Sequence, residues 1–236
     1  MLEVSNIHTY YGRSHILQGV TLQVKKGEMV CLLGRNGMGK STTLKSIMGL
    51  TPPTRGDLVF EGQNLRALKA YQIPRLGISY VPEDRRIFAS LSVGENLLLG
   101  TKIFKGMKRA QIDENLKRVY KYFPILQDKE KDPGRSLSGG QQQMLAIARG
   151  FMGNPKLMLM DEPSEGLAPI IVKELISIVS QMCREEGLTL ILVEQNARLA
   201  IQASDRGYVL EKGVVRYEGD RSYLLESPDV LHCCCL

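Results

Sequence analysis

The residues with the clearest capacity for chemistry form a glycine-rich segment early in the chain, Gly34-Arg35-Asn36-Gly37-Met38-Gly39-Lys40-Ser41. The segment matches G-x-x-x-x-G-K-[ST] between an apolar run and a helical pattern. Glycines let the backbone curl so that N–H groups point at phosphate oxygens, and the following helix adds its positive N-terminal end. Lys40 supplies a charge for the β- and γ-phosphates, and the Ser41 hydroxyl is a magnesium ligand. With Thr42, this segment predicts a site for ATP and Mg²⁺, the alternative being a glycine-rich turn without a ligand.

Two carboxylates follow a second apolar run, in the segment Leu157-Met158-Leu159-Met160-Asp161-Glu162. Asp161 can hold magnesium through its water shell, because a hard cation prefers oxygen ligands. Glu162 is then placed to orient and deprotonate an attacking water. Acidic residues often close a buried strand without any catalytic role, but the phosphate loop in the same chain favours ATP hydrolysis.

A third segment, Leu137-Ser138-Gly139-Gly140-Gln141, precedes another predicted helix. A Ser-Gly-Gly turn at a helix N-terminus can bind an anion, and it can equally be a simple helix cap. One nucleotide does not need two phosphate-binding turns that lie far apart in the sequence. The second turn therefore suggests that two copies meet head to tail, each completing the site of the other.

In the order and approximate spacing of these three segments, the chain resembles the ATP-binding subunits of ABC transporters over essentially its full length. The resemblance implies an α/β fold with a P-loop NTPase core, a largely parallel sheet, an N-terminal antiparallel β subdomain and an inserted helical subdomain. It also implies that Ser138 and Gly140 contact the γ-phosphate held by the opposite subunit. Tyr11, in a Tyr-Gly pair, is implied to stack on adenine, although a strand-end aromatic is the alternative.

Three positions depart from the general family pattern. Glu83 stands where Gln is usual, Gln195 where His is usual, and Ala168 where the loop after Glu162 usually ends in Asp. Glu83 can still reach magnesium, now with added charge. Gln195 can donate a hydrogen bond to the γ-phosphate but cannot carry a proton as His can. We expect Glu83 among the metal ligands and Gln195, with Glu162, among the catalytic residues.

The segments VPEDRRIF, DEPSEGLAP and LVEQNA resemble one branch of the family. That branch comprises bacterial importers of branched-chain amino acids, in particular the second of their two ATPase subunits, and a close relative imports urea and short amides. The resemblance implies two transmembrane permease subunits as partners, a second ATPase subunit paired head to tail, and indirectly an extracytoplasmic solute-binding protein. It also implies a peripheral location on the cytoplasmic side of the membrane.

Two other classes of protein share the phosphate loop. A small-molecule kinase is disfavoured because a water activator such as Glu162 is what a kinase must avoid. A soluble ATP-switched protein of repair or translation generally carries paired ATP domains or long coiled coils, and neither is present in the sequence. The segment 86–97, with Ile87, Phe88 and Leu91, is expected either to form a groove for a helix of a membrane subunit or simply to pack in the core.

These residues require elements that position them. Apolar alternation and continuous apolar runs predict strands in the first 33 residues, a strand pair at 58–60 and 78–81, and strands at 157–160 and 188–193. A hairpin is expected at 208–218, and helices are expected from Ser41 to Met48 and from Pro169 to Gly187. Strand–helix alternation predicts one α/β domain over residues 1–236, with a helical subdomain at approximately 84–155.

Composition narrows the class of protein. The chain has 43% hydrophobic and 24% charged residues, as in globular proteins, and its apolar runs fall short of the roughly 20 residues that cross a bilayer. The N-terminus lacks the apolar core of a secretory signal. A net charge of +6 without a basic–aromatic cluster indicates no nucleic-acid partner. The terminal run Cys233, Cys234 and Cys235 is expected to be a frayed tail without function.

Overall fold

The N-terminal part of the chain forms a four-stranded antiparallel sheet. The computed structural model describes residues 1–102 and 107–235. The sheet has the order β2-β1-β4-β5, formed by Leu2–Tyr11 (β1), Ser14–Val24 (β2), Arg55–Phe60 (β4) and Gln63–Asn64 (β5). In β2, Val20, Leu22 and Val24 are buried while Thr21 and Gln23 are exposed. This alternation of side chains between the two faces confirms the predicted strand.

A six-stranded sheet forms the centre of the molecule, in the order β10-β9-β3-β8-β7-β6. Its strands are Met29–Leu33 (β3), Ile78–Val81 (β6), Leu157–Asp161 (β7), Thr189–Val193 (β8), Arg206–Glu211 (β9) and Val214–Asp220 (β10). All neighbours pair in parallel except β10 with β9. Strands β3, β7 and β8 are buried at every position, which accounts for their continuous apolar sequences. Because parallel strands end at the same edge, the loops after β3, β6, β7 and β8 lie together.

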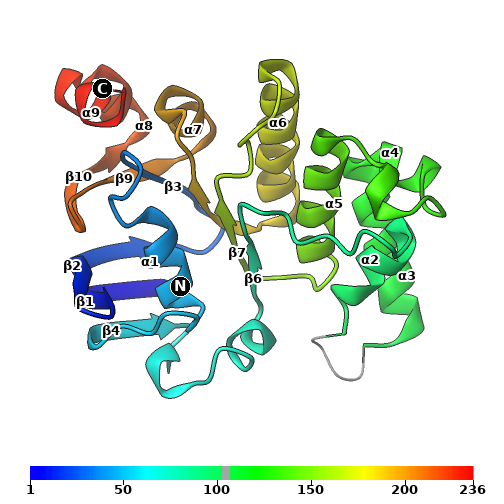
Figure 1. Ribbon diagram of the computed structural model, residues 1–236, viewed down its shortest axis with the longest axis horizontal. Helices are drawn as coiled ribbons and strands as arrows, with labels where there is room; N and C mark the ends of the chain where they lie inside the picture. Colours follow the sequence, from blue (N-terminus) through cyan, green and yellow to red (C-terminus); the bar gives the residue numbers. More distant parts are fainter. Residues whose placement is uncertain (103–106, 236) are drawn as a thin grey trace.

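Helices cover both faces of this central sheet (Figure 1). Helix α1 (Lys40–Ile47) packs with the antiparallel sheet on one face. On the other face lie α5 (Gly139–Phe151), α6 (Pro169–Glu186), α7 (Ala197–Ala203), α8 (Arg221–Glu226) and α9 (Pro228–Cys235). Side chains of β3 alternate between these two faces. Met29, Cys31 and Leu33 belong to the buried cluster that includes α5 to α9, whereas Val30 and Leu32 belong to the cluster that includes α1 and the antiparallel sheet. The fold is therefore the predicted α/β architecture.

The helical part of the chain projects beyond the β6 edge of the sheet (Figure 1). It contains α2 (Val93–Leu99), α3 (Arg109–Tyr122), α4 (Pro124–Asp128) and the N-terminal part of α5. Short 3₁₀ turns lie at Leu65–Ala67, Ile73–Leu76 and Gly134–Ser136. Val119 and Phe123 are buried, and Leu116 and Tyr120 pack partly buried against the same core. Pro124 begins the next helix, as its fixed φ favours.

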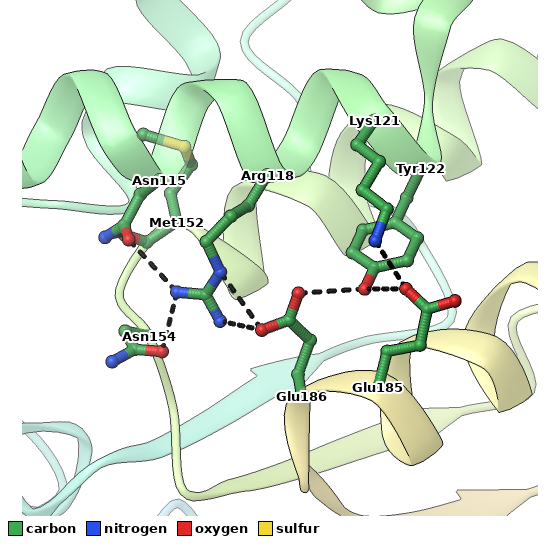
Figure 2. A network of polar contacts seen from close by, with 8 residues as sticks. All are labelled: Asn115, Arg118, Lys121, Tyr122, Met152, Asn154, Glu185 and Glu186. Carbon is green, nitrogen blue, oxygen red and sulfur yellow. Dashed lines mark hydrogen bonds and ion pairs between the residues drawn. The ribbon is translucent and has the colours of Figure 1, made fainter.

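A polar network joins α3 to the C-terminal end of α6 (Figure 2). Arg118 donates to Oε2 of Glu186 at 3.1 and 2.6 Å, and it also donates to Oδ1 of Asn154 at 3.0 Å. The Tyr122 hydroxyl contacts Glu186 Oε1 at 2.8 Å and Glu185 Oε2 at 2.9 Å. The planar guanidinium of Arg118 donates several hydrogen bonds in fixed directions, a geometry that a lysine cannot reproduce. The network fixes one side of the helical part to the core.

Replacing Arg118 by Ala is expected to lower the free energy of unfolding by roughly 1–3 kcal/mol, because Glu186 is left partly buried without its cation. Replacing Lys121, whose ion pair with Glu185 is more exposed, is the matched control and should have a smaller effect. Urea unfolding of both variants measures the difference. Equal losses would contradict a special contribution of Arg118.

Two predictions about the elements are wrong. The strands at 58–60 and 78–81 do not pair: β4 lies in the antiparallel sheet, and β6 is an edge strand beside β7. The tail is not frayed as far as Cys235, because Pro228–Cys235 forms α9. Val230 is fully buried and Cys233 packs partly buried against the core, so apolar contacts order this end of the chain. Over the residues given above, no helix is both long and apolar enough to cross a membrane.

Candidate functional site

The phosphate loop connects β3 to α1, and two of its glycines are required by close packing. Gly34 has φ 138°, and a Cβ there would lie 2.4 Å from the carbonyl oxygen of Leu210. Gly39 has φ 105°, and a Cβ there would lie 2.7 Å from Leu17. Met38 anchors the loop through its carbonyl, which accepts from the amide of Gly213 at 3.2 Å. The loop is therefore held in a curled conformation that only glycine permits at these positions.

Lys40 begins α1 at the end of the loop and is almost fully buried. Its Nζ donates to the carbonyl oxygens of Gly34 at 2.8 Å and Arg35 at 3.3 Å. It also lies 3.2 Å from Oε1 of Glu162, which is 7% exposed. The predicted phosphate-binding lysine and the predicted water activator are thus in direct contact.

Asp161 ends β7 beneath the phosphate loop and is 2% exposed. The Ser41 hydroxyl donates to its Oδ1 at 2.8 Å, so the two predicted magnesium ligands meet. The Tyr80 hydroxyl, on neighbouring β6, donates to Oδ2 at 2.9 Å. Burial raises the pKa of Asp161, against the lowering effect of these two hydrogen bonds. Burial and the Asp161 carboxylate also raise the pKa of Tyr80 far above its usual value, which keeps that hydroxyl a donor.

Replacing Tyr80 by Phe is expected to lower the free energy of unfolding by roughly 1–3 kcal/mol, because one oxygen of a buried carboxylate loses its donor. Tyr71→Phe is the control, since the Tyr71 side chain is 59% exposed. Thermal and urea unfolding measure both variants. A stability equal to the wild type in Tyr80→Phe would show that the contact contributes nothing.

Glu162 follows β7 directly and adopts a left-handed backbone conformation, with φ 48°. Such a conformation costs roughly 1–3 kcal/mol for a non-glycine residue and is concentrated at functional sites. Its amide donates to the carbonyl of Val193 at 2.9 Å, which ties it to the end of β8. Two residues further along, Gln195 donates through Nε2 to Oε2 of Glu162. The two predicted catalytic residues are therefore hydrogen-bonded.

The loop after Glu162 is held by a buried carboxylate that the sequence analysis did not single out. Glu194 is 1% exposed and accepts from the amide of Ser164 at 3.1 Å and from its hydroxyl at 2.6 Å. Burial raises the pKa of Glu194, and the hydrogen bonds from Ser164 oppose this rise. Because Gln195 is the next residue, Glu194 fixes the loops that carry Glu162 and Gln195 relative to each other.

Glu83 follows β6 and is exposed beside Glu165. A hydrogen bond with Glu165 raises the pKa of Glu83, and partial burial and the charges of Glu165 and Glu162 raise it further. When two carboxyl groups lie this close, repulsion between their charges disfavours ionisation of both at once. Several negative groups thus gather at one side of the site, where a cation would be favoured.

One pocket of about 330 Å³ lies between most of these side chains, although Asp161, Tyr80 and Glu194 are not part of its described lining. Its lining residues are Tyr11, Ile16, Asn36, Gly37, Gly39, Lys40, Ser41, Thr42, Glu83, Glu162, Glu165 and Gln195. Tyr11 is 46% exposed, and its hydroxyl lies 3.3 Å from Oγ1 of Thr51. The topology thus brings together residues from four loops that the sequence analysis had connected only by their chemistry.

The segment 137–141 contributes nothing to this pocket as far as the structure describes its lining. Ser138 caps α5: its hydroxyl accepts from the amide of Gln141 at 3.4 Å, and its own amide donates to the Gln141 side chain at 3.0 Å. Leu137 is buried, while Ser138 and Gly139 are exposed. The exposed turn is therefore available to another molecule rather than to the pocket of its own chain.

Comparison with known proteins identifies the family. A family model described as ABC transporter matches residues 17–165. The chain belongs to the ABC transporter family. This ATP-binding subunit is 43% identical over 230 residues to the high-affinity branched-chain amino acid transport ATP-binding protein BraG of Pseudomonas aeruginosa, covering 98% of this chain and 97% of BraG. A probable branched-chain amino acid transport ATP-binding protein, LivF of Archaeoglobus fulgidus, is 32% identical, with 96% and 94% covered. The lipopolysaccharide export protein LptB of Escherichia coli K12 is 31% identical, with 97% and 94% covered.

Solved structures agree with this family. An ATP-binding subunit of an ABC transporter superposes with a TM-score of 0.84 at 28% identity, covering 98% of this chain and 94% of that one. A dimeric ATP-binding cassette with ADP and Pi bound superposes with a TM-score of 0.82 at 26% identity, covering 94% and 99%. The predicted family, fold class and ATPase activity of this subunit are confirmed.

Four residues of the ATP-binding subunit's site were missed by sequence reasoning, the first of which, Glu165, lines the pocket with Glu83. Tyr80 lies inside an ordinary strand sequence, and only the parallel pairing of β6 with β7 places it beside Asp161. Ile16 reaches the pocket from β2 in the other sheet. Glu194 stood next to a residue already singled out, and a charged side chain directly after a fully apolar strand was the available signal.

Proposed function

We propose that this ATP-binding subunit hydrolyses ATP with Mg²⁺ to power uptake of branched-chain amino acids, as a peripheral subunit on the cytoplasmic side of the membrane. The observation that supports branched-chain amino acids as the cargo is the 43% identity to BraG over nearly the whole of both chains. The chemistry is supported by the contact of Lys40, Glu162 and Gln195 in one pocket.

The site fits a magnesium ion. Ser41 Oγ and Asp161 Oδ1 lie 2.8 Å apart at the base of the phosphate loop, and hard cations prefer such oxygen donors. Glu83 lines the same pocket as Ser41 and adds a further carboxylate. Bound magnesium would neutralise charge on the phosphates. A cation at this position would also favour the ionised form of Asp161, whose pKa is raised by burial.

Each of several residues of the pocket has a distinct role in ATP hydrolysis. Lys40 exchanges its contact with Glu162 for the γ-phosphate, as a lysine in a phosphate loop does. The released Glu162 orients water and accepts its proton. Gln195 holds the Glu162 carboxylate through an N–H donor and so fixes its orientation toward the attacking water. Tyr11 and Ile16 supply an aromatic and an apolar surface for adenine at the pocket's mouth.

A second ATPase subunit, the same chain or a related one, completes the site head to tail. Support comes from the exposed turn at Ser138, which lies outside its own chain's pocket, and from the dimeric cassette among the similar structures. Donors from both subunits would surround the γ-phosphate, where preorganised electrostatic stabilisation is strongest. The two permease subunits, and through them a solute-binding protein, are the further partners.

The permease subunits have a docking surface in an apolar groove of about 670 Å³. It is lined from both the core and the helical part by Met48, Leu50, Ala70, Tyr71, Pro74, Ile78, Ser79, Tyr80, Val81, Pro82, Phe88, Leu99, Gly100, Ala146, Arg149, Gly150, Gly153 and Pro155. Among the residues that the structure describes, Arg149 is the one charged residue in this lining. We propose that a short amphipathic helix of a permease subunit, carrying a carboxylate for Arg149, occupies it.

The segment 86–97 was expected either to form a groove for a helix of a membrane subunit or to pack in the core, and its residues divide between the two. Phe88 is 54% exposed and lines the groove. Ile87 packs partly buried against the core, and Leu97 is fully buried within it. The groove therefore uses one apolar residue of this segment rather than the whole of it.

Reconstituted uptake tests the cargo. Liposomes containing the permease subunits, the ATPase subunits and ATP are expected to accumulate labelled leucine in the presence of the binding protein. Accumulation should disappear with Lys40→Ala, which removes the phosphate-binding charge. Accumulation of labelled urea in place of leucine would contradict the proposed cargo and leave the ATPase assignment intact.

A further inference from the structure

Three aromatic rings lie against one another on the hairpin formed by β1 and β2. The rings of Tyr10 and His15 are nearly parallel, with centroids 4.2 Å apart and planes inclined by 7°. The centroid of His15 also lies 5.3 Å from that of His8. Nε2 of His15 is 3.1 Å from Nδ1 of His8, so one imidazole donates its N–H to the other. We call these three rings the Tyr10–His15–His8 stack.

The pairing of β1 with β2 places the stack on the face that points away from the core. Tyr10 and His15 are direct cross-strand partners, and His8 lies two residues before Tyr10 on the same strand. Residues two apart on a strand share a face. Thr9, between them, is fully buried, whereas Tyr10 is 37% exposed. The stack therefore joins the two strands from outside, as cross-strand aromatic pairs do.

A β-bulge beside the stack directs two other side chains to the nucleotide pocket. The register of the ladder shifts between Thr9 and Tyr10, which leaves Ile16 as an extra residue of β2. Bulges re-aim side chains and are frequent next to active sites. Ile16 and Tyr11 both line the pocket. Ile16 directly follows His15 and Tyr11 directly follows Tyr10, so the stack lies behind the two side chains that face the pocket.

The Tyr11 ring depends on its backbone for its orientation. The residue is 46% exposed, and its hydroxyl lies 3.3 Å from Oγ1 of Thr51, which is long for a bond between two hydroxyls. If a ring that receives a base is not oriented beforehand, the free energy of binding includes the cost of ordering it. The stack orders the hairpin at the residue from which Tyr11 continues.

We infer that His15 is a positioning residue for the adenine of ATP, acting through its stack on Tyr10 and its hydrogen bond with His8. This inference rests on the proposed contact of adenine with Tyr11 and Ile16. The stack fixes the end of the hairpin, so both side chains already face the pocket when the nucleotide binds. Such preorganisation raises the affinity for the base. It leaves the hydrolytic step at the γ-phosphate unchanged.

Binding of ATP and of inorganic tripolyphosphate to the full chain, measured by calorimetry with Mg²⁺, tests the inference. Tripolyphosphate can occupy the phosphate loop but has no base. His15→Ala is expected to weaken ATP binding by about two- to tenfold, the usual contribution of one aromatic pair, and to leave tripolyphosphate binding unchanged. In turnover assays, KM for ATP should rise by the same factor at unchanged kcat.

Two further variants control this test. His232→Ala changes the third histidine of the chain, which is exposed in α9, and should behave as the wild type. His15→Phe keeps a ring for Tyr10 to stack on but loses the nitrogen that meets His8. Its ATP affinity should lie between those of His15→Ala and the wild type. An affinity as low as that of His15→Ala would contradict the contribution of the stacked rings.

The outcomes separate this inference from the proposed function. Unchanged ATP affinity in His15→Ala, with weakened affinity in Tyr11→Ala, would overturn the role of His15 and leave the contact of adenine with Tyr11 intact. Unchanged ATP affinity in Tyr11→Ala would contradict that contact, and the inference with it. Equal losses of ATP and tripolyphosphate binding in His15→Ala would attribute the effect to the fold as a whole and overturn the inference as well.

Discussion

Replacing Glu162 by Gln is expected to reduce ATP turnover by roughly a hundred- to ten-thousand-fold, the usual contribution of a general base. ATP affinity should change little, because Lys40 and the loop amides that bind the phosphates remain. The amide cannot accept the proton of the attacking water, so ATP-bound dimers are expected to accumulate. Steady-state turnover, equilibrium binding of ATP and size-exclusion chromatography measure the three effects.

Glu165→Gln is the matched control for this prediction. Glu165 lines the same pocket and is also a glutamate, whereas the carboxylate that contacts Lys40 and Gln195 belongs to Glu162. The fall in turnover should be much smaller in this variant. Unchanged turnover in Glu162→Gln would refute its role as the base and shift attention to the other pocket carboxylates.

Replacing Ser138 by Arg should abolish hydrolysis although the phosphate loop is untouched. The exposed Ser138 turn lies outside the pocket of its own chain, so the proposed site is complete only when a second subunit supplies it. A bulky cation at this turn blocks the approach of the two subunits. ATP binding by the isolated chain should persist. Measuring turnover against protein concentration provides the second test, because a shared site predicts a rate per chain that rises with concentration.

Ser92→Arg is the matched control, because Ser92 caps α2 with the same reciprocal hydrogen bonds that Ser138 makes on α5. Both substitutions remove a helix cap worth about 1 kcal/mol. An equal loss of turnover in both variants would attribute the effect to folding. A turnover per chain that is independent of concentration in the wild type would contradict the shared site.

The sequence predicted the chemistry of the site better than its geometry. The phosphate loop and the Asp161–Glu162 pair were recognisable because their residue types and spacing are demanded by the ligand. The contact of Tyr80 with Asp161 was not predictable, because it depends on which strands are neighbours in the sheet. The direct ion pair of Lys40 with Glu162 joins residues far apart in the sequence and required the same topology.

The largest errors concerned elements whose order depends on tertiary contacts. Helix α9 carries a run of cysteines at its end, and nothing local distinguishes that run from a frayed tail. Val230 is buried against the core, and this packing orders the helix. The positive φ angles of Arg85 and Arg86 were likewise not predictable, because no residue type in that segment indicates them.

The ion pair between Lys40 and Glu162 bears on when the Glu162 carboxylate is free to act on water. Without nucleotide, this carboxylate is held by the ammonium group of Lys40 and by the side-chain amide of Gln195. It loses the Lys40 contact only when the γ-phosphate draws that lysine away. The nucleotide itself thus switches on the base that cleaves it, and only where it binds with all three phosphates. A subunit that holds ADP, which lacks the γ-phosphate, therefore keeps its base in contact with Lys40 until ATP returns.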